Sequence, residues 1–266
     1  MRRQAVAGRW GLAGTEIRLD GKVALVTGGT KGIGKAIALR LADAGAQVVV
    51  CGRNAPAEDF GAEFIACDIR DPAAATAMIE EIAQRHGRLD ILVNNAGGSP
   101  PADAATASPR FSERIIQLNL LAPLNLSQAS YAPMVANGGG VIVNIASVSG
   151  TRPSPGTAAY SAAKSGLFGL TRSLAHEWGP AIRVNAIVVG YVETETTDAT
   201  YGGAEAQAAI ASNIGMQRLA RASEIADAVL YLSSPFSSYV TGAAIHVDGG
   251  GERPPFLDIV KEHNHG

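Results

Sequence analysis

Short runs of apolar residues recur along the chain, and most of them are continuous rather than alternating between apolar and polar positions. Continuous runs of this length are typical of strands that are buried on both faces of a sheet. We therefore predict seven strands, at 22–27, 47–51, 62–66, 89–93, 140–146, 182–189 and 243–247.

Segments with helical periodicity lie between these strands. Residues 33–44 place Ile33, Ile37 and Leu41 on one stripe, and Gly45 is a residue type that ends helices. Further helices are expected at 72–86, 109–136, 156–179 and 223–233. Strands that alternate with helices predict the α/β class, with a parallel sheet and helices on both of its faces.

Composition and charge limit the kinds of binding partner that we expect for this domain. Of the 266 residues, 47% are hydrophobic and 17% are charged, which excludes disorder for the bulk of the chain. The net charge of −2 gives no electrostatic footprint for nucleic acid. We therefore expect no nucleic-acid partner. No apolar run approaches the length of a membrane span, so we expect no membrane partner either.

The two ends are expected to be tails. Residues 1–18 lack the apolar core of a signal peptide, so we predict a flexible N-terminal tail and a cytoplasmic protein. No linker or internal repeat divides the rest, which predicts one catalytic domain at 19–251 and a C-terminal tail at 252–266.

Cysteine and histidine provide no evidence for a metal site. Cys51 and Cys67 are too few for a disulfide framework or a four-ligand zinc site, so we expect two buried thiols. His263 and His265 lie in the expected C-terminal tail, where two histidines form no closed site.

A glycine-rich turn follows the first strand and leads directly into a helix. Gly28, Gly32 and Gly34 have the spacing GxxxGxG. Glycine lets the backbone approach a pyrophosphate, and a helix N-terminus supplies free N–H groups and positive potential. This spacing predicts a dinucleotide site, with a turn that holds no ligand as the alternative.

The end of the second strand favours NADP(H) over NAD(H). Sites for NAD usually place an acidic residue there, which binds the ribose 2′-hydroxyl. Here Gly52 is followed by Arg53, and Lys31 lies inside the glycine turn. For either cation alone, a solvated surface charge is the favoured explanation, but the two together near the ribose suit a 2′-phosphate.

Candidate catalytic groups follow the fifth strand. Tyr160 and Lys164 are four residues apart on the next helix and share one face, and Ser147 directly follows the strand. An ammonium lowers the pKa of a nearby tyrosine, and a serine hydroxyl can hydrogen-bond an oxygen that becomes an alkoxide. Taken alone, Tyr-x-x-x-Lys also fits an ordinary helix face.

The motifs occur together, and the chain resembles the classical short-chain dehydrogenases/reductases over about 19–250. The resemblance rests on the order and spacing of Thr27–Gly34, Asn94-Asn95-Ala96-Gly97, Asn119, Ser147, Tyr160 with Lys164, and Val247-Asp248-Gly249-Gly250. It implies one Rossmann-type doubly wound domain with the strand order 3-2-1-4-5-6-7.

The resemblance also implies roles for individual residues. Tyr160 would be the acid/base, Lys164 would hold the nicotinamide ribose, Ser147 would orient the substrate carbonyl and Asn119 would hold a relay water. The cofactor contacts that it implies, besides Tyr160 and Lys164, are Gly28, Thr30, Lys31, Ile33, Arg53, Asp68, Ile69, Asn95, Ala96, Gly97, Gly190, Val192 and Thr194.

The chain departs from the family pattern after the sixth strand. Val189 stands where the family usually has proline before the glycine, so the turn is expected to be less rigid. Gly190 and Thr194 are kept, and a contact to the nicotinamide carboxamide through Val192 and Thr194 is still expected.

A proline predicts a bend in the segment 109–136. Pro123 has no N–H, so the carbonyl of Asn119 loses its partner four residues later. We expect a bend there with that carbonyl open to a water, or alternatively a kink without any role.

The substrate is expected to be a small carbonyl compound or secondary alcohol. The presumed substrate loop, 191–222, is small and polar and suits a mobile lid. The alternative is a 3-oxoacyl group on acyl carrier protein or CoA. An acidic carrier would need basic docking residues, and 115–151 contains no Lys or Arg.

Two further expectations concern the functional class of the protein and its oligomeric state. The alternative to an enzyme is a sensor that binds a dinucleotide without turnover. A sensor would not need Asn119, Ser147, Tyr160 and Lys164 together. Small residues such as Ala162 and Gly169 on helix 156–179 allow close helix packing, and the resemblance implies a homotetramer, with a homodimer as the alternative.

Overall fold

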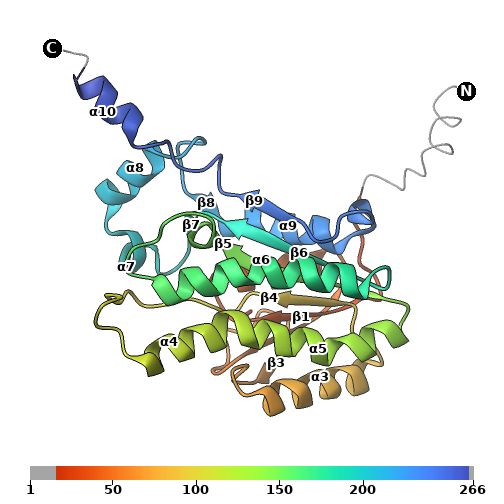
Figure 1. The fold of residues 1–266 in the computed structure, drawn as a ribbon. Coiled ribbons are helices and arrows are strands. Elements are labelled where there is room, and N and C mark those ends of the chain that lie inside the picture. Colours follow the sequence, from red (N-terminus) through yellow and green to blue (C-terminus); the bar gives the residue numbers. More distant parts are fainter. Residues whose placement is uncertain (1–15, 264–266) are drawn as a thin grey trace, which may run out of the picture.

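Seven parallel strands form the centre of the molecule in the computed structural model, which describes residues 16–263 (Figure 1). The strands are β1 (Val23–Thr27), β2 (Gln47–Gly52), β3 (Glu63–Ala66), β4 (Ile91–Asn94), β5 (Gly140–Ser147), β6 (Ile182–Val189) and β9 (Ala244–Val247). Their order is β3-β2-β1-β4-β5-β6-β9. Because β9 is the seventh strand of this sheet, the expected order is confirmed.

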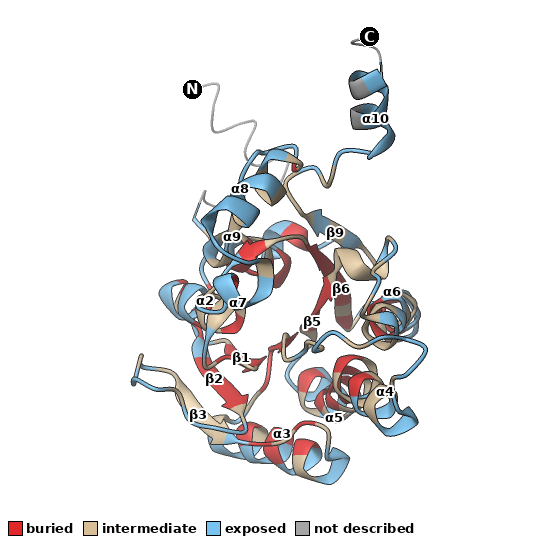
Figure 2. Cartoon of the chain, turned by 90° about the vertical axis from the view of Figure 1, so that its left-hand side faces the viewer, coloured by how far each residue is buried: buried red, intermediate tan, exposed pale blue. Residues whose placement is uncertain are grey.

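Helices cover both faces of the sheet, as predicted (Figure 2). One face carries α2 (Gly32–Asp43) and α9 (Ala222–Ser233), which also pack on each other. The other face carries α3 (Pro72–His86), α4 (Pro109–Ile116), α5 (Ala122–Ala136) and α6 (Ala158–Trp178).

Strand β1 shows why the apolar runs are continuous. Ala24 and Val26 belong to the core on the α2 and α9 face, whereas Val23 and Leu25 belong to the core on the α3 and α5 face. Successive side chains of a strand point to opposite faces, so a strand covered on both sides needs apolar residues at every position.

The segment predicted as one helix, 109–136, is interrupted. A π-helical turn, Gln117–Leu121, separates α4 from α5, and the N–H of Ala122 donates to the carbonyl of Gln117 five residues earlier. Pro123 is at the start of α5. A proline that cannot donate to the preceding turn favours such an interruption, which lies where the bend was expected.

The segment expected as a loop, 191–222, contains regular elements of its own. These are β7 (Val192–Glu193), α7 (Thr197–Tyr201), α8 (Ala204–Ser212) and β8 (Ala220–Arg221). Strands β7 and β8 pair in parallel and hold the two ends of this segment together.

The chain ends differ in part from plain tails. Ile17, which lies inside the predicted tail 1–18, packs against the core, and residues 1–15 lie outside the described residues. After Gly251, Glu252 forms a bridge with Ile214, and α10 (Phe256–His263) follows. His265 also lies outside the described part of the chain.

Helix character, metal-ligating side chains and cysteines can be described for residues 16–263. None of the helices there has the length and apolar character to cross a membrane. Likewise, no group of three or more metal-ligating side chains is found in that part of the chain. Cys51 and Cys67 are free thiols, and both are buried as predicted.

Candidate active site

A large cavity lies at the carboxyl ends of the parallel strands. The register places the end of β5, Ser147, beside Val189 at the end of β6, and Val189 beside Val247 at the end of β9. The cavity has a volume of about 740 Å³. Ligands of doubly wound sheets bind at this edge, where the strand order reverses.

The cavity brings together almost all of the predicted site residues. Asn119 is the exception, because it is fully buried and does not line the cavity. The predicted residues that line the cavity are Gly28, Thr30, Lys31, Ile33, Arg53, Asp68, Ile69, Asn95, Ala96, Gly97, Ser147, Tyr160, Lys164, Gly190, Val192 and Thr194.

The glycine turn has the geometry of an anion site. Gly28 has a φ of 63°, and a Cβ on Gly34 would lie 2.2 Å from the carbonyl oxygen of Gly28. Both positions therefore require glycine. Lys31, which precedes the first turn of α2, does not cap the helix with its side chain. Uncapped N–H groups and a close backbone approach fit a dinucleotide pyrophosphate.

A carboxylate from a distant segment already occupies this anion site. The N–H of Gly32 donates to Oε1 of Glu195 over 3.2 Å. Hydrogen bonds from backbone N–H groups, that of Glu195 first and that of Gly32 next, hold the pKa of the Glu195 carboxyl below its usual value, and Lys35 and Lys31 act in the same direction. Glu195 is therefore ionised at neutral pH and competes with any phosphate bound there.

We expect Glu195→Gln to tighten the binding of NADPH. The variant removes a negative charge from the N-terminus of α2, an interaction that changes affinity by about 2- to 5-fold. Fluorescence titration with NADPH would measure the dissociation constant. Glu193→Gln, an exposed carboxylate outside the cavity lining, is the control. Unchanged or weaker binding to Glu195→Gln would contradict this competition.

The segment after β4 is attached to the end of β1. The hydroxyl of Thr27 accepts hydrogen bonds from the N–H groups of Asn95 and Ala96, both over 3.0 Å. The side-chain amide of Asn95 donates to the carbonyl oxygens of Thr27 at 2.8 Å and Gly28 at 3.3 Å. Asn95 therefore holds the glycine turn in place while its backbone lines the cavity.

The far end of the cavity is basic. Gly52 leaves no acidic side chain at the end of β2, and Arg53 and Lys31 line the wall beside it. Asp68 is paired with Arg70, with Oδ2 and Nη2 at 2.5 Å, and this contact lowers the pKa of the Asp68 carboxyl. The Asp68 carboxylate is thus already paired with a cation, which leaves this end suited to a phosphate.

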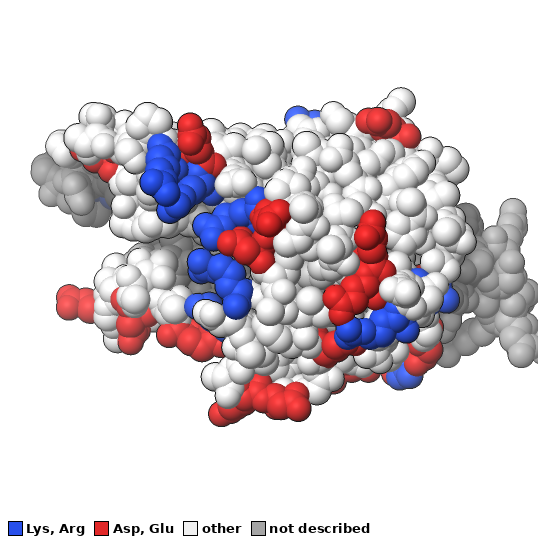
Figure 3. Space-filling model, turned by 90° about the horizontal axis from the view of Figure 1, so that it is seen from below, with Lys and Arg blue, Asp and Glu red and all other residues white. Residues whose placement is uncertain are grey.

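Figure 3 shows how the charged side chains are distributed on one face of the molecule. A hollow opens on the left of this face, and Lys and Arg side chains border it, with acidic groups among them and over the rest of the face. On this face no broad surface of one sign is formed, in keeping with the small net charge of −2.

Ser147, Tyr160 and Lys164 meet at the other end of the cavity. Lys164 is buried, with 4% of its surface exposed, and its Nζ donates to the carbonyl oxygen of Ile145 over 2.7 Å. The same nitrogen lies 5.6 Å from the centre of the Tyr160 ring. The backbone contact therefore fixes the ammonium beneath the tyrosine.

The pKa of Tyr160 differs from the expectation. Burial raises it, and the neighbouring Tyr201 adds to this, while a hydrogen bond with Ser147 acts in the opposite direction. Burial also lowers the pKa of Lys164 to about 8. The expected lowering by the ammonium is not found, because in this geometry desolvation of the phenol is the largest effect.

Asn119 is fully buried and attaches the loop at Gly98 to the end of α4. Its Oδ1 accepts from the N–H of Gly98 over 2.9 Å, and its Nδ2 donates to the carbonyl oxygens of Gly98 at 3.0 Å and Ile115 at 2.9 Å. A Cβ on Gly97 would lie 2.6 Å from Oδ1 of Asn119 and 3.3 Å from Nζ of Lys164. A Cβ at position 97 would therefore crowd both side chains, which favours glycine there.

The turn after β6 is held in place without the family's proline. The N–H of Gly190 donates to the carbonyl oxygen of Val247 over 3.3 Å, and a Cβ on Gly190 would lie 2.8 Å from Cα of Asp248. Val189 itself is paired on both sides within the sheet. These contacts to β9 and the residue after it stabilise the turn, which was expected to be less rigid because Val189 replaces proline.

Several cavity residues were not identified from sequence. Glu195, Arg152, Tyr191 and Tyr201 all line the cavity. Tyr191 and Tyr201 were noted only as large groups in a polar loop. Arg152 could have been recognised, since it lies five residues after Ser147 and directly follows a long segment without Lys or Arg.

Comparison with known proteins agrees with this geometry. Residues 28–252 match the family model described as enoyl-(acyl carrier protein) reductase. An uncharacterised short-chain type dehydrogenase/reductase from Sinorhizobium fredii is 38% identical over 248 residues, covering 87% of this chain and 98% of the relative. The 3-oxoacyl-[acyl-carrier-protein] reductase of Escherichia coli is 38% identical over 242 residues, covering 88% and 98%.

A solved structure extends the comparison to three dimensions. The gluconate 5-dehydrogenase from Burkholderia cenocepacia, in complex with NADP and tartrate, is similar with a TM-score of 0.82 and 34% identity. The match covers 88% of this chain and 96% of that protein. The chain belongs to the short-chain dehydrogenase/reductase family, which confirms the expected family and its oxidoreductase class.

Proposed function

We propose that this enzyme transfers a hydride between NADP(H) and a carbonyl group or secondary alcohol of a small organic substrate. The observation that carries the proposal is one cavity with two different ends. One end holds Ser147, Tyr160 and Lys164, and the other holds the glycine turn with Lys31 and Arg53. Relatives with bound NADP support the choice of cofactor.

The chain's own residues would handle the proton and orient the reacting groups. Bound NADPH supplies the hydride. Ser147 would donate a hydrogen bond to the substrate oxygen, and Tyr160 would give its proton to that oxygen as negative charge develops on it. The raised pKa of Tyr160 keeps the phenol protonated at neutral pH, the form needed for reduction.

The remaining assigned residues would bind the cofactor and hold a relay water. Lys164, fixed by the carbonyl of Ile145, would hold the nicotinamide ribose. Lys31 and Arg53 would pair with the 2′-phosphate, and the backbone at Val192 and Thr194 would contact the carboxamide. Asn119 would hold the loop at Gly98 and a relay water beside Lys164.

A panel of carbonyl compounds and alcohols would test this function. We expect NADPH-dependent reduction of at least one small polar ketone or aldehyde, followed by absorbance of the cofactor. The panel should include acetoacetyl-CoA. If no compound is turned over while NADPH binds normally, a sensor role replaces the enzyme proposal.

Reduction of a 3-oxoacyl thioester is the second candidate. It is favoured by the 38% identity to 3-oxoacyl-[acyl-carrier-protein] reductases. Against it, residues 115–151 offer no Lys or Arg for an acidic carrier. A small polar substrate is supported by the relative that acts on gluconate. Faster reduction of acetoacetyl-CoA than of any free ketone would favour the thioester.

We also propose that copies of the chain assemble through their long helices, as a homotetramer or homodimer. Leu121, Tyr131 and Val135 expose large apolar groups along the α5 region. On α6, a Cβ on Gly169 would meet no neighbour within 4 Å, whereas one on Gly166 would touch Leu120. Part of the small-residue surface of α6 is therefore open to another helix.

The two free thiols support the cytoplasmic location that we also propose.

A further inference from the structure

Arg152 is a cation in the substrate half of the cavity for which the hydride transfer described above has no use. It lies between the short turn Val148–Gly150 and α6, and it lines the same cavity as Ser147 and Tyr160. Its side chain is 32% exposed, so most of the guanidinium's stem is covered by protein. Such a group needs a partner of opposite charge.

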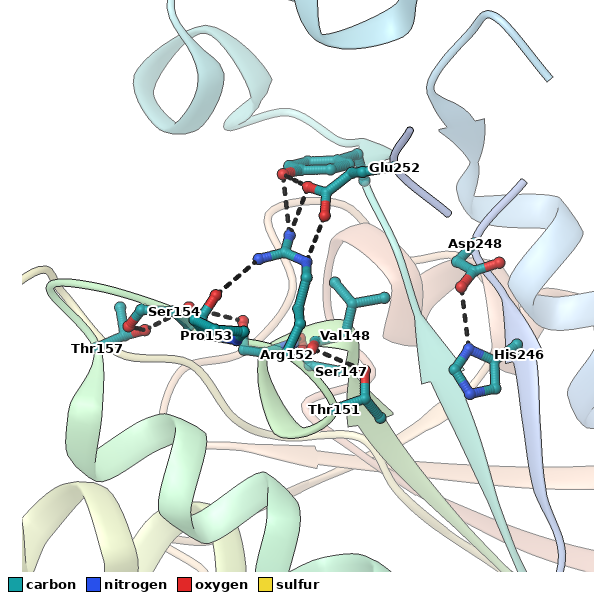
Figure 4. Close-up of polar contacts among 12 residues, drawn as sticks. Ser147, Val148, Thr151, Arg152, Pro153, Ser154, Thr157, His246, Asp248 and Glu252 are labelled. Carbon is teal, nitrogen blue, oxygen red and sulfur yellow. Dashed lines mark hydrogen bonds and ion pairs between the residues drawn. The ribbon is translucent and has the colours of Figure 1, made fainter. Parts of the chain in front are cut away.

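Glu252 is the partner in this structure, and Figure 4 shows the Arg152 fork directed toward it. Nη2 of Arg152 donates to Oε1 of Glu252 over 2.7 Å and to the Tyr191 hydroxyl over 3.0 Å. The Tyr191 hydroxyl in turn donates to Glu252. Asp248, the other nearby carboxylate, accepts instead from Nδ1 of His246 at 2.9 Å.

The pairing leaves part of the guanidinium unused. Nε of Arg152 is buried and lies 2.5 Å from Oε2 of Glu252, but it has no well-directed hydrogen bond to any residue of 16–263. Within the same range, Nη1 donates only to the carbonyl oxygen of the next residue, Pro153, over 3.2 Å. A guanidinium has five N–H donors in one plane and can bind carboxylates along more than one edge.

Glu252 approaches Arg152 from outside the active-site cavity. It lines a second cavity of about 190 Å³, and Arg152 and Tyr191 form part of the wall shared by the two. Glu252 follows Gly249, Gly250 and Gly251, whose φ values are 68°, 90° and 72°. Arg152 therefore has a carboxylate on one side and the substrate cavity on the other.

The surroundings of Arg152 in the active-site cavity are polar. Ser149 and Thr157 line the cavity close to it, and Ser154 links their hydroxyls at 3.2 Å and 2.8 Å. The rings of Tyr191 and Tyr201 pack edge to face, with centroids 5.5 Å apart, and complete this side. Hydroxyls and one cation suit a hydroxylated acid better than an alkyl chain.

We propose that the substrate is a small hydroxy- or oxo-carboxylate, whose carboxylate pairs with Arg152 while its reacting carbon faces Ser147 and Tyr160. This inference rests on the proposed function and names the substrate class of that site. Glu252 then acts as the internal counter-ion that holds the guanidinium in place and limits how tightly the acid binds.

A matched pair of substrates would test the role of the carboxylate. The 5-ketogluconate anion and L-sorbose differ only in a carboxylate against a hydroxymethyl group. We expect a higher kcat/KM for the acid. Arg152→Met should lower the acid-to-sugar ratio by about 10- to 100-fold, the usual effect of losing a charge-assisted hydrogen bond. Glu252→Gln should raise that ratio, because a competing charge is removed.

The control is Arg85→Met, which removes an arginine that pairs with Glu81 and Glu63 in α3 and β3, outside the cavity. It should leave the acid-to-sugar ratio at the wild-type value. If Arg152→Met also leaves the ratio unchanged, or if L-sorbose is the better substrate of the wild type, the carboxylate proposal is wrong.

A binding measurement separates this inference from the proposed function. With NADP bound, tartrate should raise the melting temperature of the wild type and not of Arg152→Met, and the uncharged analogue threitol should have no effect on either. Dependence on Arg152 without turnover of any carbonyl would overturn the proposed function and support the carboxylate site. Turnover of neutral ketones without any effect of tartrate would overturn the carboxylate site alone.

Discussion

Tyr160→Phe is expected to reduce kcat by about 100- to 10,000-fold, the usual contribution of a general acid. The variant keeps the ring, which lies 5.6 Å from Nζ of Lys164, and removes only the hydroxyl that supplies the proton. Binding of NADPH should be retained, because Lys164 is held by the carbonyl of Ile145 and not by the phenol.

The measurement is steady-state reduction of the best substrate from the panel, together with a fluorescence titration of NADPH. Tyr239→Phe provides the control, since Tyr239 is fully exposed and lies outside the cavity. A kcat for Tyr160→Phe within a few-fold of the wild type would exclude Tyr160 as the proton donor.

Arg53→Glu should have the second largest effect, a fall of at least about 10-fold in the preference for NADPH over NADH. The variant places an acid next to Gly52, the strand end where sites for NAD carry one. It removes one of two cations from the proposed 2′-phosphate site and adds repulsion, while the glycine turn remains unchanged.

The preference is the ratio of kcat/KM for the two cofactors, so a general loss of activity cancels. Arg110→Glu, an exposed position at the start of α4, is the matched charge reversal and should leave the ratio unchanged. Equal use of both cofactors by the wild type would contradict the assignment of Lys31 and Arg53.

The sheet and its helices were predictable because each depends on local patterns. A strand covered on both faces favours continuous apolar residues, as in Val23–Val26 of β1 and Ala186–Val189 of β6. The start and end of α2 follow from a glycine turn and from Gly45, whose φ is 97°. These signals lie within a few residues of the elements that they define.

The same reasoning explains why most of the predicted site residues line the cavity. The carboxyl ends of parallel strands meet at one edge, so motifs that follow β1, β4, β5 and β6 must converge there. The spacing of Tyr160 and Lys164 places both on one face of α6.

Contacts between distant segments could not be predicted in this way. Glu195 lies 163 residues from Gly32 along the chain, and Glu252 lies 100 residues from Arg152. No local pattern distinguishes either carboxylate from an ordinary surface charge. Their positions follow from the path of β7, α8 and the residues after β9.

The electrostatic state of Tyr160 was likewise not predictable from local sequence. Sequence spacing indicated that Lys164 lies near Tyr160, and this proximity suggested a lowered pKa. Burial raises it instead, because the pKa depends on how much water the surrounding elements exclude from the phenol. Local sequence thus accounts for the secondary structure and for the edge where the site forms, whereas charge pairing and burial within the site arise from the packing of segments far apart in the chain.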